Sequence, residues 1–521
     1  MARQGADEEG ERLNMKKRSS RAVMLVCLLA CLLSLLVVGC GSSGSSKTIK
    51  GASDLAGKIV GVQEGTTGDL DITDNDDIKV KTVERYNTGY EAVQALKQGK
   101  VDAVIIDDQP AQTFVNQVKG LKILDEPFEE EQYAICFQKG SDLTAGFNTA
   151  MEELKNDGTL DKIINAYLDA SSKNKTLQSA VYTSPAGTDT SKGTLKMATS
   201  ADFPPYEYHA DDDSILGIDA EVAQAICDKL GYKLEIEDMK FDSIITSVAA
   251  GKDDFGMAGM TVTDERKESV DFSDTYVTAQ QAIIIKAGSS SSGQSLAQQF
   301  KANFIDGSRW KLLLQGLGTT LEITLFAVII GIVLGFLCAV VRCAHDQTGG
   351  LKILNFICKL YTTVIRGTPT LLQLLIWYFV VFAAVDVNKI FVCVIAFGLN
   401  SGAYVCEIVR SGIMSVDAGQ MEAGRSLGFS YSKTMWYIIL PQAFKNVLPA
   451  IGNEVITLLK ETSIAGYIAV TDLTKAGDII RSRTFSAFLP YIAVALIYLA
   501  MVLILAKLLG MLERRLRESE R

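Results

Sequence analysis

The sequence divides into two halves of very different hydropathy. Residues 48–287 are rich in Asp, Glu, Lys and Gly, whereas residues 310–510 consist mainly of long apolar runs. The averages over all 521 residues, 48% hydrophobic and 21% charged, conceal this division. About 20 consecutive apolar residues can cross the hydrocarbon core of a membrane as a helix. The sequence therefore predicts a water-exposed part followed by a membrane part.

The apolar half predicts an all-α membrane domain with about five transmembrane helices. The five segments are 320–341, 353–385, 390–409, about 438–470, and 489–509. If residues 48–287 lie outside the cell, five crossings leave the C-terminus inside. Arg342, Lys352, Arg410 and the Arg-rich end at 513–517 then face the cytoplasm, as the positive-inside rule prefers.

The polar half alternates predicted strands and helices in two blocks, residues 50–170 and 194–287. Residues 58–62 form a short apolar strand, and residues 99–107 lead into a buried strand that ends in a carboxylate. Strand–helix alternation favours an α/β fold with a largely parallel sheet. The segments at 171–193 and 288–308 are rich in Ser and polar residues, and we interpret them as a linker and a spacer.

The N-terminal region resembles a signal peptide. Met15 begins a basic stretch, the apolar run at 22–38 follows, and Gly39-Cys40 ends it. The last residues resemble a bacterial lipobox, in which Cys40 becomes the lipidated N-terminus of the mature chain. An uncleaved anchor helix is the alternative, and both Met1 and Met15 remain candidate starts. Either interpretation places the next domain outside the cytoplasm.

The helical half resembles amino acid permeases of ABC importers along residues 310–517. The motifs GLGTTLEIT, RGTPTLLQ, SGAYVCEIVRSGI, IILPQA and LLKETSIAGYI occur in the family's order. Residues 411–441 resemble the EAA loop, which docks on a separate ATPase. The resemblance assigns this coupling role to four residues: Glu422, Ala423, Gly424 and Gly428. Gly424 replaces a usual Ala, and we expect it to weaken the short helix by up to about 1 kcal/mol and to loosen docking.

The polar half resembles the polar amino acid-binding proteins of these importers, but its blocks are in reversed order. DLAGKIVGVQEGTTG begins at Asp54, whereas ATSADFPPYEY begins only at Ala198. The resemblance implies a two-lobed, periplasmic-binding-protein-like (Venus flytrap) α/β domain that is circularly permuted. Residues 50–170 correspond to lobe 2 with the C-terminal helices, and residues 194–287 to lobe 1. A lobe swap between chains and a remnant of tandem domains are the alternatives.

An amino acid needs one opposite charge for its carboxylate and another for its ammonium group. Arg266 offers a planar fork suited to a carboxylate, and Asp107 offers the counter-charge for the ammonium. The resemblance gives further substrate contacts to Thr261, Gly259, Thr66, Phe203, Phe241, Gln63 and Ser200. Surface ion pairs and ordinary core aromatics are the competing interpretations. An acid at position 200 would indicate a cationic substrate; Ser200 instead favours a neutral or acidic one, with glutamine first.

The two resemblances together imply the receptor-permease subunit of an ATP-driven importer for polar amino acids, and not an enzyme. The implied partners are a free amino acid, a second copy of the chain, and a cytoplasmic ATPase dimer that holds ATP-Mg. GSSGSSKT at 41–48 lacks the second glycine of a P-loop, so we expect no ATP cofactor in this chain. We also expect no metal site, because the sequence contains no C-x-x-C pair.

Other function classes fit the sequence less well. The net charge of −10 argues against a nucleic-acid partner. A ligand-gated channel would carry its pore between the lobe segments, and an enzyme of this fold would not need the permease half. An amino-acid-sensing membrane receptor with a remnant or swapped binding domain, and no transport, is the main alternative. The expected location is the bacterial cell membrane, with several spans and the binding domain outside.

Overall fold

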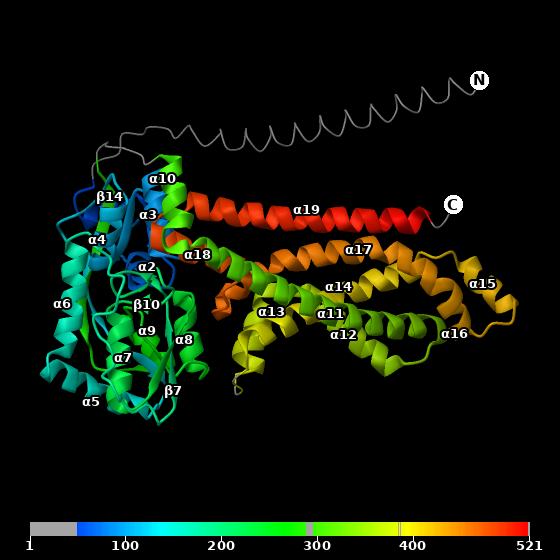
Figure 1. Cartoon of the computed structure of the whole chain (residues 1–521), viewed down its shortest axis with the longest axis horizontal. Helices are drawn as coiled ribbons and strands as arrows, with labels where there is room; N and C mark the ends of the chain where they lie inside the picture. The colour runs from blue at the N-terminus through cyan, green and yellow to red at the C-terminus, as the bar shows by residue number, and fades with distance from the viewer. Residues whose placement is uncertain (1–48, 288–294, 384, 386, 519–521) are drawn as a thin grey trace, which may run out of the picture. The chain divides into compact units, whose positions relative to one another are not determined.

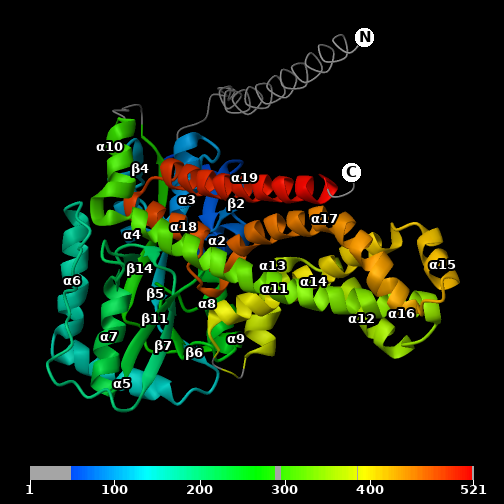
Figure 2. The ribbon, with the colours of Figure 1, turned by 45° about the vertical axis from the view of Figure 1, so that its right-hand side comes forward.

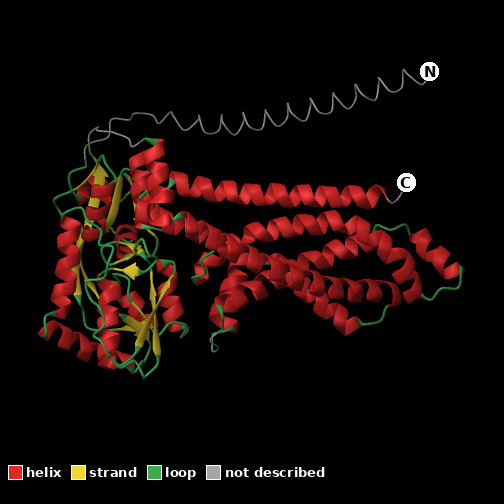
Figure 3. Cartoon of the chain, viewed as in Figure 1, coloured by secondary structure: helices red, strands yellow, loops and turns green. Residues whose placement is uncertain are grey.

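The structure is a computed structural model that describes residues 49–287, 295–383, 385 and 387–518. Strands occur only before residue 287 among these residues, and every element from residue 296 onward is helical (Figures 1 and 3). This division follows the two hydropathy regimes of the sequence. The predicted signal peptide and Cys40 lie outside the described residues.

The lobe 2 sheet has the strand order β2-β1-β3-β14-β4, and β5 also pairs with β14. Its strands are β1 (Ile59–Gln63), β2 (Thr82–Tyr86), β3 (Ala103–Asp107), β4 (Leu121–Ile123), β5 (Glu129–Tyr133) and β14 (Val277–Lys286). A 3-10 turn (Ala52–Leu55) precedes β1, and the helices of this lobe are α2 (Thr67–Thr73), α3 (Gly89–Gln98) and α4 (Asp108–Gln117). β1 runs parallel to β2 and β3, but β14 is antiparallel to its neighbours, so the sheet is mixed.

The lobe 1 sheet has the strand order β11-β7-β12-β6-β13. Its strands are β6 (Cys136–Gln138), β7 (Thr194–Thr199), β11 (Lys233–Asp238), β12 (Phe255–Gly256) and β13 (Val270–Phe272). A small antiparallel sheet joins β8 (Asp202–Phe203), β9 (Glu207–His209) and β10 (Ile215–Leu216). The helices are α5 (Leu143–Asn156), α6 (Thr159–Ser172), α7 (Ile218–Leu230), α8 (Phe241–Ala249) and α9 (Asp264–Ser269).

Each sheet takes one strand from the other sequence block. β6 follows β5 in the chain but belongs to the lobe 1 sheet, and β14 follows β13 but belongs to the lobe 2 sheet. The predicted boundaries at 50–170 and 194–287 therefore do not coincide with the two lobes. β5 and β6 are separated by only two residues, where the chain passes from one sheet to the other. Two crossings, at residues 134–135 and 273–276, connect the lobes.

The predicted linker at 171–193 is attached to lobe 1. The backbone N–H groups of Val181 and Tyr182 donate to the Glu221 carboxylate of α7, at 3.0 and 2.6 Å. The Tyr182 hydroxyl donates to Asp228 on the same helix. The predicted spacer at 288–308 is helical from Leu296, because Ser295 and Gln298 form a capping box at the start of α10 (Leu296–Phe300).

Among the described residues, three helices have the length and composition of a membrane span: α11 (Trp310–Thr348), α14 (Lys389–Met414) and α19 (Phe488–Glu518). The segment α12 (Lys352–Gly367) with α13 and its π-helical end (Thr370–Val381) would be a fourth, bent by 111° at Thr368-Pro369. The predicted span at about 438–470 is α17 (Leu440–Glu461), which is not among them. The predicted count of five is thus approximate.

Three short helices complete the domain. α15 (Ala418–Ser426) and α16 (Tyr431–Thr434) lie in the predicted coupling loop, and a π-helical turn (Met435–Ile439) joins α16 to α17. α18 (Leu473–Thr484) lies between α17 and α19 in the chain and packs on α11 and α19.

Candidate functional site

A small cavity lies between the two lobes, and it collects every residue that the sequence predicts for substrate binding. Lobe 2 contributes Gln63, Thr66, Thr67 and Asp107; lobe 1 contributes Ser200, Phe203, Glu207, Phe241, Ala258, Gly259, Thr261 and Arg266. Nine of these twelve are the predicted residues. Thr67, Glu207 and Ala258 were not predicted.

Arg266 places a buried guanidinium at the boundary between the lobes. It lies in α9, whose first turn is capped by the Thr263 hydroxyl. Nη1 donates to the Thr261 carbonyl at 2.7 Å, and Nη2 donates to the Gly65 carbonyl of lobe 2 at 2.9 Å. The guanidinium also lies 5.5 Å from the centroid of the Phe241 ring. Burial lowers the pKa of Arg266, while nearby acids, Glu131 first, oppose that shift.

Asp107 ends β3 and is the buried acid on the opposite side. It accepts hydrogen bonds from the Tyr133 hydroxyl and the Gln281 amide. Burial, reinforced by Glu131, raises the pKa of Asp107 well above its ordinary value. The hydroxyl of Thr261 donates to Glu131 at 2.7 Å. The sequence predicts that this hydroxyl contacts the substrate. In this structure it is hydrogen-bonded to the Glu131 carboxylate of β5 instead.

Gly259 allows the Phe203 ring to approach the backbone closely. Its φ of +53° is a left-handed conformation, and a Cβ there would lie 2.9 Å from the Phe203 ring. The Gly259 N–H donates to Asp219 at 2.7 Å, and Asp219 also accepts from the Tyr276 hydroxyl. Burial raises the pKa of Asp219 to about 7.

The remaining predicted residues border the cavity from the end of β1 and from the loops that follow β1 and β7. The Gln63 side chain accepts from the Gly89 N–H at 3.0 Å, and the Thr66 hydroxyl donates to the Gln63 carbonyl at 2.8 Å. The Ser200 hydroxyl lies 3.4 Å from Asp202. These contacts position polar groups around the space where a ligand side chain would extend.

Glu207 is the functional candidate that the sequence interpretation missed. It lies on β9 and is fully buried, and its side chain hydrogen-bonds another buried acid, Asp219. Burial, and then the neighbouring Asp219, raise the pKa of Glu207 well above its ordinary value. Glu207 is one of the two acids of the quoted ATSADFPPYEY motif, but the motif alone does not indicate that this side chain is buried.

The charges of the cavity are unequal. Two acids, Asp107 and Glu207, line it beside a single base, Arg266. Two more buried acids, Glu131 and Asp219, contact lining residues from behind. Buried charges are costly without partners. A zwitterionic ligand would satisfy Arg266 and Asp107, and an additional positive group would satisfy Glu207.

The predicted coupling residues lie together on the surface at α15. Glu422 and Ala423 are exposed, whereas Gly424 is buried. A Cβ at Gly424 would clash with Thr434 and approach Ile438 to 3.0 Å. Gly424 thus allows the two short helices to pack closely, which is a different consequence from the looser docking that we expected. Gly428 ends α15 with φ +85°.

Comparison with known proteins agrees with this arrangement. The family model of the bacterial extracellular solute-binding proteins, family 3, matches residues 195–460, beginning in β7 and running into the helical part. The arginine transport system permease protein ArtQ of Bacillus subtilis (strain 168) is 39% identical over 210 residues, covering 40% of this chain and 94% of the relative.

Two further similar proteins each match about two fifths of the chain. The putative glutamine transport system permease protein GlnP of Rickettsia typhi (strain ATCC VR-144 / Wilmington) is 34% identical over 206 residues, covering 39% of this chain and 92% of the relative. A solved amino acid ABC transporter with histidines is 41% identical and covers 43% of this chain and 99% of that one, with a TM-score of 0.39. This chain therefore belongs to the permeases of amino acid ABC transporters and carries a family-3 extracellular solute-binding domain.

Proposed function

We propose that the solute-binding lobes capture a free α-amino acid and deliver it to the membrane domain of the same chain, which translocates it. The observation that carries the proposal is the cavity itself. It combines a buried guanidinium from lobe 1, Arg266, with a buried carboxylate from lobe 2, Asp107. These are the two counter-charges that any α-amino acid requires.

Substrate binding favours closure of the lobes, because its carboxylate and ammonium groups bind to opposite lobes. In this structure Nη2 of Arg266 donates to the Gly65 carbonyl of lobe 2. A substrate carboxylate accepts charge-assisted hydrogen bonds and is a stronger partner than a neutral carbonyl. The closed state therefore gains stability when substrate is present, which is a hinge-type population shift.

The membrane domain acts with partners. We expect two copies of the chain to form the pathway, and an ATPase dimer carrying ATP-Mg to bind the exposed surface of α15 around Glu422. The binding domain lies outside the cell, tethered at Cys40 if the lipobox is processed. A single-chain circular permutation is supported by strand pairing between the blocks, since β6 pairs with β12 and β14 pairs with β3. The anchored linker at 171–193 further supports this arrangement.

The side chain of the substrate has two candidate chemistries. Ser200 favours a neutral polar substrate, glutamine, and one of the similar permeases is named for glutamine. Glu207 favours a cationic side chain, because it is a second buried acid in the cavity lining and adjoins another buried acid, Asp219. A similar permease is named for arginine. The first proposal is a polar amino acid with glutamine expected, and the second is a cationic amino acid.

Transport and binding assays on the full chain distinguish these candidates. The chain is reconstituted with an ATPase of this transporter class, and uptake of labelled glutamine and of labelled arginine is followed with and without ATP. ATP-dependent uptake of either confirms an importer. A chain that binds an amino acid but never transports it would instead support the sensing receptor.

The Glu207→Gln variant separates the two substrates. If the side chain is cationic, this variant weakens arginine binding by about 30-fold or more, because a buried charge partner is lost. If the substrate is glutamine, binding changes little, since a neutral amide still fits. Glu235→Gln, which alters an exposed acid of the same lobe, is the matched control and leaves both affinities unchanged.

A further inference from the structure

One helix of the membrane domain, α18, contacts both lobes of the solute-binding domain. Figures 1 and 2 both place it beside α3 of lobe 2. It also packs on β9 of lobe 1. The two sets of contacts converge on one side chain, Arg481, which is 1% exposed.

The two terminal nitrogens of the Arg481 guanidinium contact different lobes. Nη1 donates to the Thr88 hydroxyl of lobe 2 at 3.1 Å, and the guanidinium lies 5.6 Å from the centroid of the Tyr90 ring. Nη2 lies 3.9 Å from the Asp202 carboxylate of lobe 1. Within α18, Nε lies 3.7 Å from Asp478. A buried guanidinium in this position depends on groups from both lobes for its stabilisation.

Thr88 and Asp202, the partners of Arg481, are each next in the chain to a residue that lines the ligand cavity or contacts its lining. Thr88 precedes Gly89, whose N–H holds the Gln63 side chain. Asp202 precedes Phe203, which lines the cavity. Arg481 therefore contacts residues that move with the two walls of the cavity. Opening the hinge would separate Thr88 from Asp202, and one side chain could no longer reach both.

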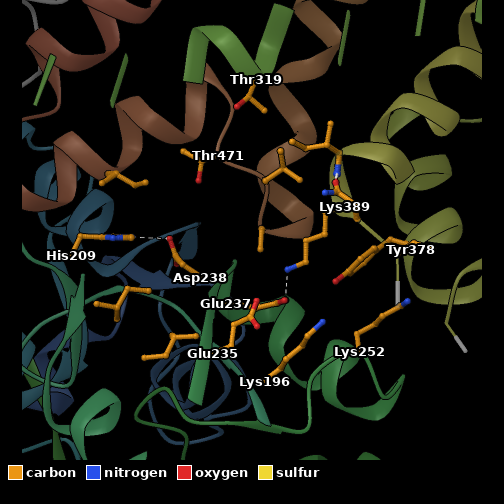
Figure 4. Close-up of a pocket in the computed structure, with 18 residues that line it drawn as sticks. Lys196, His209, Glu235, Glu237, Asp238, Lys252, Thr319, Tyr378, Lys389 and Thr471 are labelled. Carbon is orange, nitrogen blue, oxygen red and sulfur yellow. Dashed lines mark hydrogen bonds and ion pairs between the residues drawn. The ribbon is translucent and has the colours of Figure 1, made fainter. Parts of the chain in front are cut away.

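Among the described residues, each of the other ion pairs and ring contacts between the two domains involves one lobe. Lobe 1 pairs through Lys475 with Asp238 at 2.8 Å, Arg483 with Asp213 at 2.6 Å, and Lys389 with Glu237. The Lys389–Glu237 pair and the pair between His209 and Asp238 border a polar pocket between lobe 1 and the membrane domain (Figure 4). Lobe 2 packs Tyr90 and Phe114 around Phe485. Each of these contacts alone can stay with its own lobe when the hinge opens, but the lobe 1 and lobe 2 contacts of α18 and Phe485 cannot all be kept together.

We propose that Arg481 is the contact through which the membrane domain distinguishes the closed solute-binding domain from the open one. The inference rests on the proposed function, because it needs a ligand that closes the lobes. In the open state α18 can keep its contacts with one lobe only. Only the closed state adds the bridge from Thr88 through Arg481 to Asp202.

The coupling between substrate binding and the Arg481 contact must be reciprocal. If the membrane domain binds the closed state better through Arg481, then Arg481 must also raise the substrate affinity of the intact chain by the same factor. Coupling free energies between sites are typically 1–3 kcal/mol, or roughly 5- to 150-fold. Substrate affinity in the full chain therefore reports on the bridge, although Arg481 does not line the cavity.

The test measures glutamine and arginine affinity of the full chain in nanodiscs by calorimetry. Arg481→Ala is expected to weaken binding of the recognised amino acid by about tenfold, within the usual range of coupling. Arg483→Ala is the matched control, since Arg483 pairs with lobe 1 alone; its affinity should stay within about twofold of the unmodified chain. Asp202→Asn removes the lobe 1 partner and should weaken binding in the same direction.

A double variant keeps the test independent of misfolding. Groups in one network are non-additive, so Arg481→Ala with Asp202→Asn should cost no more than Arg481→Ala alone. Equal affinity of Arg481→Ala and the unmodified chain, equal losses in both arginine variants, or fully additive losses would each overturn the proposal. If the unmodified chain binds neither amino acid, the proposed function fails first, and that result is recognisable without any variant.

Discussion

The substrate cavity and the coupling loop are built in opposite ways. The cavity draws twelve lining residues from both lobes, and its charged groups, Asp107, Glu207 and Arg266, are all buried. The coupling residues come from one short stretch, and Glu422 and Ala423 are exposed on α15. The first is a closed site made by tertiary structure, and the second is a local surface that a partner would complete.

The two regions also differ in what holds them in shape. Buried charges and their hydrogen bonds define the cavity, as at Arg266 between Thr261 and Gly65. Glycines define the loop, since Gly424 allows two short helices to touch and Gly428 ends the first of them. Changes of charge should therefore act mainly on the cavity, and changes of backbone geometry mainly on the loop.

The largest effect is expected at the buried cation of the cavity. Arg266→Ala removes the partner of the substrate carboxylate and should weaken binding by about 100-fold or more, since loss of a buried charge partner costs about 2–5 kcal/mol. Calorimetry on the full chain measures it. Arg85→Ala changes a partly exposed arginine of lobe 2 and should have almost no effect. Unchanged binding in Arg266→Ala would remove the carboxylate assignment.

A pH titration tests the role of Asp107, which lines the cavity from lobe 2 opposite Arg266. Burial raises the pKa of Asp107, whereas the substrate ammonium requires the ionised carboxylate. Binding should therefore release protons, and affinity should fall as pH decreases through the raised pKa, by up to about tenfold per pH unit. Calorimetry in buffers of different ionisation enthalpy measures the release.

The Asp107→Asn variant should bind more weakly and lose most of this pH dependence, with any remainder coming from Glu207. Asp108→Asn, which changes the adjacent acid outside the cavity lining, should keep the full pH dependence. If Asp107→Asn keeps the same proton release as the unmodified chain, the ammonium site lies elsewhere.

In the loop, Gly424→Ala distinguishes two opposite expectations. Helix propensity alone predicts a firmer α15 and stronger coupling. The structure predicts overpacking against Thr434 and Ile438, at a cost of about 1–3 kcal/mol. Substrate-stimulated ATP hydrolysis by the reconstituted complex should therefore fall several-fold, while substrate affinity stays unchanged. Increased hydrolysis would show that propensity dominates here.

The smallest effect is expected at the end of α15. The N–H groups of Gly428 and Phe429 donate to the carbonyls of Arg425 and Gly424, which is a Schellman motif with Gly428 at φ +85°. Gly428→Ala should cost about 1 kcal/mol, because a Cβ is unfavourable in this conformation. Hydrogen exchange of residues 418–429 should accelerate about fivefold. Ser426→Ala, an exposed helical position, is the control, and equal exchange in both variants would contradict the assignment.

The residues of the cavity were predictable where local sequence determines their position. Asp107 ends an apolar strand, and Arg266 lies in the first turn of a helix that begins with hydroxyl and acidic residues. Such positions follow from strand length and helix capping. Glu207 was not predictable in the same way, because an acid on a short strand is usually exposed. Its burial is decided by the folded domain, which places Glu207 in the cavity lining beside Asp219 of α7.

Sequence alone determined the membrane and water-exposed halves, the α/β character of the lobes and most individual elements, since these depend on hydropathy and periodicity over short windows. Tertiary structure decided which sheet receives β6 and β14, because strand pairing joins residues more than 100 positions apart. It also decided the consequence of Gly424, which depends on a neighbouring helix. The contact of Arg481 with both lobes likewise joins residues remote in sequence, and only packing brings them together.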